Sequence, residues 1–361
     1  MKHPLKTTKL LLPILVFLCS KSYGQELLKV AVAGLSHDHA HVIMNEGKQK
    51  KVIILGIAET DKNLIRRYQK DYNLPDSLFF DDVRTMLNHI RPDAVLAYNP
   101  ISEHLNVAEV CLPMKVPLMV EKPLAINTEQ AQRMAKLATE NQTPLLTNYE
   151  TTWYGSNQTL KEKVSMESFG KIKKMIAKDG HEGPREIGCS EEFLSWLTDP
   201  EKNGGGALMD FGCYGANLMT WLQDGARPLA VTAVTRQMKP GIYPKVEDDA
   251  VIILEYKDAV GIIEASWNWS YSIKGLQVYG SERSYNAVNG TTLIKNDNPV
   301  KYRNISLTED YYKDHLSYLK AVLDGKIKPQ NDLSSLSNNL IVVEILEAAK
   351  KSAKEGRRIQ F

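Results

Sequence analysis

The sequence has few cysteines, little net charge and no apolar run long enough to cross a membrane. Its 361 residues include only four cysteines, and no two of them have the CxxC spacing of a zinc or redox site. Lys and Arg number 45 against 43 Asp and Glu, and the positive residues are scattered along the chain. The composition therefore gives no reason to expect nucleic acid or an anionic membrane as a partner.

The first 24 residues differ from the rest and have the layout of an export signal. Three lysines precede an apolar run over residues 10–18, and residues 22–24 supply small residues for a signal peptidase. We expect residues 1–24 to be removed and the mature chain to begin near Gln25, in the periplasm or outside the cell. A spanning helix would need about 20 apolar residues. A lipid anchor on Cys19 is the other alternative, disfavoured by the bulky leucine before it.

The length predicts two domains, because 361 residues exceed the usual size of one hydrophobic core. Up to about residue 149, short apolar strands alternate with helical segments, which predicts a parallel sheet covered by helices on both faces. Strands are expected at Leu28–Gly34, Val52–Ile57, Asp93–Tyr98, Val116–Val120 and Pro144–Thr147, and helices at 103–111 and 128–141.

After Tyr149 the strands become longer and alternate between apolar and polar residues. The segments Asp249–Tyr256 and Val260–Trp267 predict an antiparallel hairpin with one buried face. Helices are expected at Ala207–Leu222 and Asn338–Ala353. In a chain of this size, we expect the three cysteines beyond the signal (Cys111, Cys189 and Cys213) to be buried free thiols.

The first strand ends at Gly34 and enters a turn that is a candidate phosphate site. A dinucleotide-binding turn favours three spaced glycines, and here Ser36 and His39 occupy the second and third positions. Ser36 can cap the next helix, whose N-terminus attracts a phosphate, although Asp38 would repel one. A metal site on the histidines at 37, 39 and 41, or a purely structural turn, are the alternatives. We expect no metal, because the sequence shows no partner cluster of ligands.

Polar residues also follow other expected strands. Glu59 stands 25 residues after Gly34, near the spacing of the acid that binds the adenosine ribose, and the absence of an arginine directly after it favours NAD over NADP. A solvated glutamate is the alternative. Asn99, His104 and the segment Glu121–Pro123 fall at the carboxyl edge of the sheet, where open parallel sheets bind ligands. Lys122 can hold a ribose hydroxyl there, whereas His104 would equally suit a surface helix.

A glycine-rich stretch over residues 204–217 carries the last group of candidates. Glycines before a helix permit close approach of the backbone to a ligand. Asp210, Tyr214 and Asn217 are spaced i, i+4 and i+7, which places them on one face of the expected helix. The alternative is the solvated polar face of an ordinary helix.

Taken together, these motifs resemble the glucose–fructose oxidoreductase, inositol dehydrogenase and MocA-type family. The matching segments are Ala97–Pro100 with His104, Glu121–Ala125, Gly204–Gly212, Glu247–Trp267, Val278–Ser281 and Ala349–Ile359. The resemblance implies an α/β fold: an N-terminal NAD(P)-binding Rossmann domain over 25–149, then a C-terminal α+β domain over 150–361 with a large, mainly antiparallel, open-faced sheet. It also implies a homo-oligomer, a dimer or tetramer.

The resemblance further implies an oxidoreductase that uses NAD to oxidise a CH–OH group of a sugar or related polyol. Lys122, Asp210 and Tyr214 are then the catalytic residues. Tyr214 would exchange the hydroxyl proton, and Lys122 would supply the positive charge that a phenol with a pKa of about 10 needs to act as a base. The implied cofactor contacts are Gly34, Ser36, His37, His39, Glu59, Asn99, His104, Glu121 and Lys122, and the implied substrate contacts are Trp153 and Asn217.

The chain departs from the family at three positions that concern the substrate. Tyr214 stands where most members have histidine, Asn217 stands where they often have aspartate, and the arginine that usually follows Tyr149 is missing. Two other functions stay open. One is a redox glycosidase or epimerase that recycles tightly bound NAD, which export favours because free NAD is scarce outside the cytoplasm. The other is a ligand-binding protein that kept the fold without the chemistry.

Overall fold

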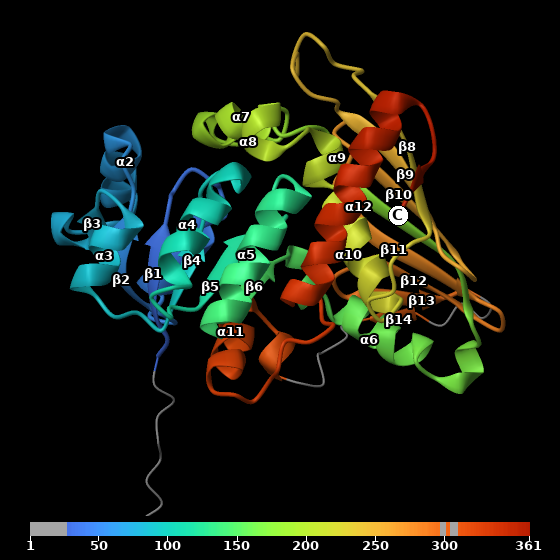
Figure 1. The fold of residues 1–361 in the computed structure, drawn as a ribbon, viewed down its shortest axis with the longest axis horizontal. Helices are drawn as coiled ribbons and strands as arrows, with labels where there is room; N and C mark the ends of the chain where they lie inside the picture. The colour runs from blue at the N-terminus through green and yellow to red at the C-terminus, as the bar shows by residue number, and fades with distance from the viewer. Residues whose placement is uncertain (1–26, 297–300, 304–309) are drawn as a thin grey trace, which may run out of the picture.

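The computed structural model describes residues 27–296, 301–303 and 310–361, which form two sheets with helices between and around them (Figure 1). The predicted signal, residues 1–24, and the expected mature start at Gln25 lie outside these residues. Within them, no helix combines the length and the apolar character needed to cross a membrane.

The first sheet has six parallel strands in the order β3-β2-β1-β4-β5-β6. The strands are β1 Lys29–Ala33, β2 Ile53–Ala58, β3 Phe79–Phe80, β4 Ala94–Ala97, β5 Leu118–Glu121 and β6 Leu145–Asn148. This is the order of a doubly wound dinucleotide-binding fold, in which the ligand crevice opens where the order reverses, between β1 and β4. The five strands expected in this region are confirmed to within two residues. The two residues of β3 are too few to show a pattern.

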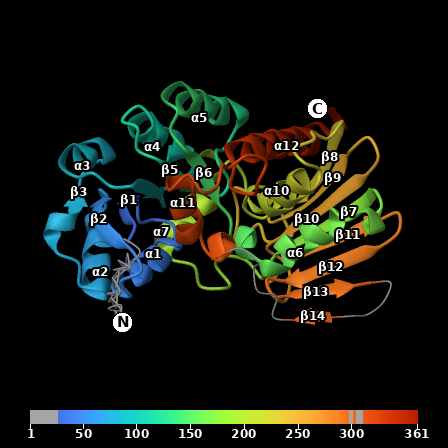
Figure 2. The ribbon, with the colours of Figure 1, turned by 90° about the horizontal axis from the view of Figure 1, so that it is seen from below.

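Helices cover both faces of the first sheet (Figure 2). They are α1 Ala40–Lys48, α2 Lys62–Tyr72, α3 Val83–His89, α4 His104–Cys111 and α5 Thr128–Asn141. Val30 and Val32 of β1 pack in the core that contains α1 and α2, whereas Ala31 and Ala33 pack in the core that contains α4 and α5. A strand buried on both faces has no polar positions, which explains why these strands read as continuous apolar runs.

The second sheet has nine strands in the order β14-β13-β12-β11-β7-β10-β9-β8-β15. They are β7 Ile172–Gly180, β8 Ala230–Arg236, β9 Asp249–Glu255, β10 Val260–Ser266, β11 Ile273–Gly280, β12 Ser284–Asn289, β13 Thr292–Lys295, β14 Lys301–Arg303 and β15 Ile359–Gln360. Only the pair β7–β10 is parallel, so the sheet is mainly antiparallel, as predicted. The predicted hairpin is formed by β9 and β10.

One face of the second sheet is covered and the other is open. Helices α6 Gly155–Val164, α10 Gly212–Leu222 and α12 Leu336–Glu355 lie on the face toward the first sheet (Figure 2). On this face Met175 and Ala177 of β7 are buried, whereas Val234 and Val251 on the other face are 51% and 39% exposed. The open-faced sheet is therefore confirmed.

The predicted helix Ala207–Leu222 is wrong as a single helix. The structure has α9 Ala207–Asp210 and then α10, which begins at Gly212 after a break at Phe211. Gly206, before α9, permits a close approach: a Cβ there would lie 1.9 Å from the carbonyl oxygen of Glu247.

The end of the chain links the two sheets. Helix α11 (His315–Leu323) returns to the first sheet, where Leu316 and Leu319 join the core of α1 and α2. Helix α12 contributes Val343 to the core of α4 and α5 and Ile345 to the core of the second sheet. The division at 149/150 thus separates the sheets, while these helices connect them.

The three cysteines within the described residues are unpaired. Cys111 and Cys213 are buried, as predicted. Cys189 is only half-buried, so the prediction is wrong for that residue.

Candidate active site

A cavity of about 610 Å³ lies at the carboxyl edge of the first sheet, between β1 and β4. Its lining includes Gly34 and Ser36 from the turn after β1, Glu59 after β2 and Asn99 after β4. The volume is in the range of small-molecule and cofactor sites. The structure thus brings together four of the predicted cofactor residues from three strand ends.

The turn after β1 is held by Gly34 and Glu59. Gly34 has φ +78°, and a Cβ at this position would lie 2.7 Å from Cβ of Asn99. The Glu59 carboxylate accepts hydrogen bonds from the backbone amides of Leu35 (2.9 Å), Thr60 (2.8 Å) and Asp61 (2.9 Å). One glycine and one carboxylate therefore shape this turn, and Glu59 is more than a solvated strand-end residue.

Two polar atoms in the cavity lining fit a bound dinucleotide. The Ser36 hydroxyl and Oδ1 of Asn99 are buried and have no hydrogen-bond partner among the described residues. Such atoms are uncommon in folded proteins and mark places where a ligand supplies the partner. A hydroxyl beside a helix N-terminus suits a phosphate, and an amide oxygen suits a ribose hydroxyl.

A segment of the second domain closes one side of this cavity. This strap, residues 190–203, contains α7 (Glu191–Leu197) and α8 (Pro200–Asn203). It contributes Glu192, Ser195, Trp196 and Lys202 to the lining. The strap was missed from the sequence, although Ser190 as an N-cap and the apolar residues Phe193, Leu194, Trp196 and Leu197 are signals of a short helix.

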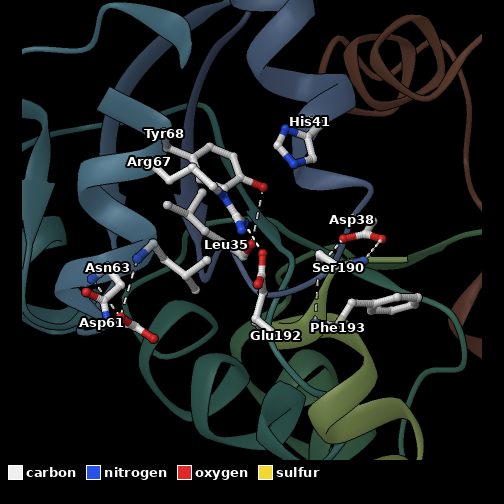
Figure 3. Close-up of polar contacts among 12 residues, drawn as sticks. Leu35, Asp38, His41, Asp61, Asn63, Arg67, Tyr68, Ser190, Glu192 and Phe193 are labelled. Atoms are coloured by element: carbon white, nitrogen blue, oxygen red, sulfur yellow. Dashed lines mark hydrogen bonds and ion pairs between the residues drawn. The ribbon is translucent and has the colours of Figure 1, made fainter. Parts of the chain in front are cut away.

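Four polar contacts hold the strap against the first domain, and Figure 3 shows those made by Asp38 and Arg67. Asp38 accepts from the backbone amide (3.1 Å) and the hydroxyl (2.5 Å) of Ser190, and Arg67 pairs with Glu192. The Trp196 indole donates to the carbonyl oxygen of Ser36 at 3.2 Å. Asp38, which would have repelled a phosphate, instead has its carboxylate engaged by the strap.

His37, His39 and Glu121 meet at the inner side of the turn, with candidate ligand atoms within 4.8 Å of one another. Glu121 is thus a neighbour that the sequence did not suggest. However, Nδ1 of His37 accepts from the backbone amide of His39 (3.1 Å), which places the hydrogen of the neutral ring on Nε2. Burial lowers the pKa of His37 well below its usual value. His37 packs against Phe193 and Trp196, and we assign it to holding the strap.

Glu121 is the centre of a hydrogen-bonded chain. It interacts with Nδ1 of His39 at 3.1 Å and accepts from Nδ2 of Asn148 at 2.8 Å, and Asn148 in turn accepts from the Trp153 indole at 3.1 Å. Burial would raise the pKa of Glu121, but His39 and the other partners hold it well below its usual value. Glu121 and Trp153, predicted as ligand contacts, therefore have protein partners in this structure.

His104 lies outside the lining of the cavity between β1 and β4, and its predicted contact with the cofactor stays a prediction. Its side chain is 0% exposed, and Nδ1 donates to the carbonyl oxygen of Leu124 at 3.1 Å. Burial lowers its pKa to about 4, so the ring is neutral near pH 7. His104 supports the turn after Lys122 through its hydrogen bond to Leu124. The residue is buried for this role, whereas the alternative expectation placed it on the surface of a helix.

The predicted catalytic residues Lys122 and Asp210 form a buried ion pair between the two domains. Nζ of Lys122 donates to Oδ1 of Asp210 at 2.5 Å and to its carbonyl oxygen at 3.1 Å, while the Trp267 indole donates to Oδ2 at 2.9 Å. Burial alone would lower the pKa of Lys122 and raise that of Asp210. The attraction between them reverses both shifts, so that Lys122 lies above and Asp210 below its usual pKa, and both stay charged.

Tyr214 lies beside this pair, with its ring centroid 5.1 Å from Nζ of Lys122. Burial raises the pKa of its phenol well above 10, and nearby carboxylates add to the effect. Asp210 balances the ammonium charge of Lys122 in this structure, and the role of Lys122 in making Tyr214 a base stays a prediction. Tyr214 keeps its proton at neutral pH.

Asn217 lies at the contact between α10 and α12, and its predicted contact with the substrate stays a prediction. Its side chain is 0% exposed, and Nδ2 donates to the carbonyl oxygen of Leu333 at 2.8 Å and to Oδ1 of Asn339 at 3.3 Å. Asn217 therefore helps to pack α10 against α12. Tyr214 and Asn217 share the unbroken helix α10, but Asn217 lies almost one turn further along, where α12 and the residues before it cover the helix.

Three further residues join the site from the second sheet: His181, Trp267 and Lys274. Nδ1 of His181 accepts from the amide of Gly183 at 2.9 Å, and its ring meets Phe211 edge-on at 4.8 Å. Burial lowers its pKa, so the neutral ring carries its hydrogen on Nε2. All three lie at or next to strand ends on the covered face. Alternation of apolar and polar residues along the strands could have placed these three residues on the covered face. It could not show which strand ends lie close to Lys122.

A doubly wound sheet with a cavity at its switch point is the arrangement of dinucleotide-binding proteins. Sequence models of one family match most of the chain: "Oxidoreductase family, NAD-binding Rossmann fold" over residues 28–149 and "GFO/IDH/MocA C-terminal domain" over residues 157–286. The chain belongs to the GFO/IDH/MocA oxidoreductase family.

Relatives in this family are distant. A trans-1,2-dihydrobenzene-1,2-diol dehydrogenase from Xenopus tropicalis is 26% identical over 203 residues, which are 56% of this chain and only 57% of the relative. A myo-inositol 2-dehydrogenase from Thermotoga maritima is 21% identical over 92% of this chain and 98% of its own. The solved aldose–aldose oxidoreductase of Caulobacter crescentus, 19% identical, covers 93% of this chain and 100% of its own with a TM-score of 0.77. These likenesses support the fold.

The strap contacts generate a prediction about cofactor release. Asp38→Asn removes the charged acceptor of Ser190, and hydrogen bonds to charged groups contribute about 1.5–3 kcal/mol. We expect NADH to leave the variant at least about fivefold faster, because opening the strap becomes easier. Stopped-flow fluorescence of NADH displaced by excess NAD measures the rate.

Asp258→Asn, at an exposed position between β9 and β10, is the matched control and should leave the rate unchanged. An Asp38→Asn variant that releases NADH at the rate of the unmodified protein would show that the strap does not retain the cofactor.

Proposed function

We propose that this chain is an exported, NAD-dependent oxidoreductase that acts on a CH–OH group of a sugar or related polyol. The observation that carries the proposal is the Lys122–Asp210 pair at the carboxyl edge of the first sheet, with the Tyr214 phenol beside it. A bound nicotinamide accepts or returns a hydride. The protein must then bind the reacting oxygen and add or remove its proton. These three side chains are placed to do so.

NAD rather than NADP is the cofactor that the cavity favours. The carboxylate of Glu59 lies in the lining, where it would repel a 2′-phosphate and bind free ribose hydroxyls. Lys62, the nearest candidate for a phosphate partner in the sequence, pairs with Asp81 at 3.2 Å. Ser36 and Asn99 would supply the remaining polar contacts.

Lys122 and Tyr214 both hold protons in this structure. In carbonyl reduction they can donate a hydrogen bond or proton to the substrate oxygen at once. In alcohol oxidation the hydroxyl proton has to leave, and the buried phenol, with its raised pKa, resists taking part as a base. Asp210 keeps Lys122 charged and fixes its position, so it acts on the reaction through the lysine.

A recycled cofactor is the second candidate, and the strap favours it. The contacts of Asp38 and Trp196 close the cavity from the second domain. An exported enzyme that retains NAD could oxidise one substrate and reduce the next, or reverse its own oxidation as a redox glycosidase or epimerase does. The Caulobacter protein of similar fold is described as an aldose–aldose oxidoreductase.

The open face of the second sheet would serve pairing into a dimer or tetramer.

Protein from the exported fraction tests cofactor and export together. We expect a mature N-terminus near Gln25 and close to one NAD per chain in a denatured extract, because the strap retains the nucleotide. Addition of aldoses or polyols should change absorbance at 340 nm as the bound NAD is reduced. No nucleotide, together with no binding of NAD or NADP on titration, would leave the ligand-binding protein as the function.

The raised pKa of Tyr214 sets the pH dependence of hydride transfer. A group with a raised pKa keeps its proton until the pH passes that pKa, so alcohol oxidation should accelerate from pH 6 through pH 9 without a plateau. Carbonyl reduction should stay nearly flat over this range. Single-turnover rates at 340 nm measure both, and Tyr214→Phe should remove the dependence. A plateau of oxidation below pH 8 would contradict a buried, protonated phenol.

A further inference from the structure

A second ion pair lies beside Tyr214 and has no part in the chemistry described so far. Nζ of Lys274, on β11, lies 5.3 Å from the Tyr214 ring centroid and donates to Oε2 of Glu150 at 2.5 Å. The Tyr154 hydroxyl donates to the other oxygen of Glu150 at 2.5 Å. The Tyr214 ring is thus close to two ammonium groups, each paired with a carboxylate.

The second pair is closer to solvent than the phenol. The side chains of Lys274 and Glu150 are 23% and 45% exposed, whereas Tyr214 is 2% exposed. Burial would raise the pKa of Glu150, but the Lys274 ammonium holds it below its usual value, so the pair is ionised at neutral pH. Lys274 and Glu150 can therefore contact a ligand from solvent, whereas Tyr214 is nearly enclosed.

A buried carboxyl group also lies next to the Lys274–Glu150 pair. Asp179 faces Lys274 in the β7–β11 pairing, is 0% exposed, and has no hydrogen-bond partner for either oxygen among the described residues. Burial raises its pKa well above the usual value, and Lys274 offsets only part of this. The raised pKa favours the neutral form of Asp179, which adds no negative charge beside Lys274.

Within the described residues, both ammonium groups near Tyr214 have carboxylate partners, so neither is free to bind an anionic substrate. Lys122 is balanced by Asp210, and Lys274 by Glu150. A carboxylate or phosphate would have to displace one of these carboxylates and lose its own hydration. A hydroxyl group can accept from Lys274 and donate to Glu150 while the pair stays intact.

We propose that the Lys274–Glu150 pair determines substrate specificity: it binds hydroxyl groups of an uncharged sugar or polyol and disfavours sugars that carry a carboxylate or phosphate. The inference rests on the proposed function, since it concerns the substrate of the same site. Lys274 and Glu150 bind the part of the substrate away from the reacting carbon, and Lys122 with Tyr214 binds the reacting oxygen.

Glu150→Gln tests the proposal, because it leaves the Lys274 charge without its partner. D-Glucose and D-glucuronate, which share a ring and differ in one charged group, are the probes, with myo-inositol and D-xylose as further neutral probes. Calorimetric titration of the NAD-loaded mature protein should show glucose binding at least tenfold tighter than glucuronate. In Glu150→Gln the ratio should shift toward glucuronate by tenfold or more.

Two further variants keep the test specific. Lys274→Met should raise KM for the neutral sugar about tenfold with a smaller change in kcat, because it removes a substrate contact and leaves Lys122 and Tyr214 in place. Glu264→Gln is the matched control, because Glu264 pairs with Lys178 at 3.3 Å across β7 and β10 on the other face of the sheet. It should leave the glucose-to-glucuronate ratio unchanged.

An unchanged ratio in Glu150→Gln overturns the proposal, as does an unmodified protein that prefers glucuronate or binds none of the probes. Failure of the proposed function is a different result: the sugars bind with the expected ratio, but none of them reduces the bound NAD at 340 nm. The binding titration and the absorbance measurement therefore separate the two claims.

Discussion

The buried ion pair between Lys122 and Asp210 is the contact on which the rest of the site depends. Lys122 follows β5 of the first sheet, and Asp210 ends α9 over the second sheet, so the pair exists only when both domains are in place. Removal of one partner from a buried pair typically costs about 3–5 kcal/mol, because the other charge is left without compensation. The fold therefore locates a charged pair at the junction where the cofactor cavity and the covered face of the second sheet meet.

The surroundings of this pair explain the protonation of the site. Asp210 receives the Trp267 indole as well as Lys122, and its charge cancels that of the lysine. The Tyr214 phenol therefore lies beside an ammonium group whose charge is already compensated. Burial raises the pKa of the phenol and favours its protonated form. The same balance recurs at Lys274 and Glu150. A site in which each lysine is paired with a carboxylate suits neutral molecules with many hydroxyl groups. It disfavours anionic sugars, because neither Lys122 nor Lys274 is available to pair with them.

Much of this architecture could be predicted from the sequence. Continuous apolar strands, the spacing from Gly34 to Glu59 and the position of Lys122 after a strand are local signals, and the structure places Gly34, Ser36, Glu59 and Asn99 around one cavity. What local patterns could not show depended on tertiary contacts. His104 is buried beneath a turn, and Asn217 lies against α12. The strap and the residues His181, Trp267 and Lys274 come from the second sheet, and no local pattern shows which strand ends meet across a domain boundary.

The most direct test of this account is a double-mutant cycle on Lys122 and Asp210. Single-turnover hydride transfer would be measured at 340 nm in Lys122→Met, Asp210→Asn and the double variant, with retained NADH fluorescence as the check on folding. The account predicts that each single change slows the step by about 100-fold or more, and that the double variant is no slower than the worse single one, because the two residues act as one unit. Losses that multiply in the double variant, or an Asp210→Asn protein with nearly full activity, would contradict it.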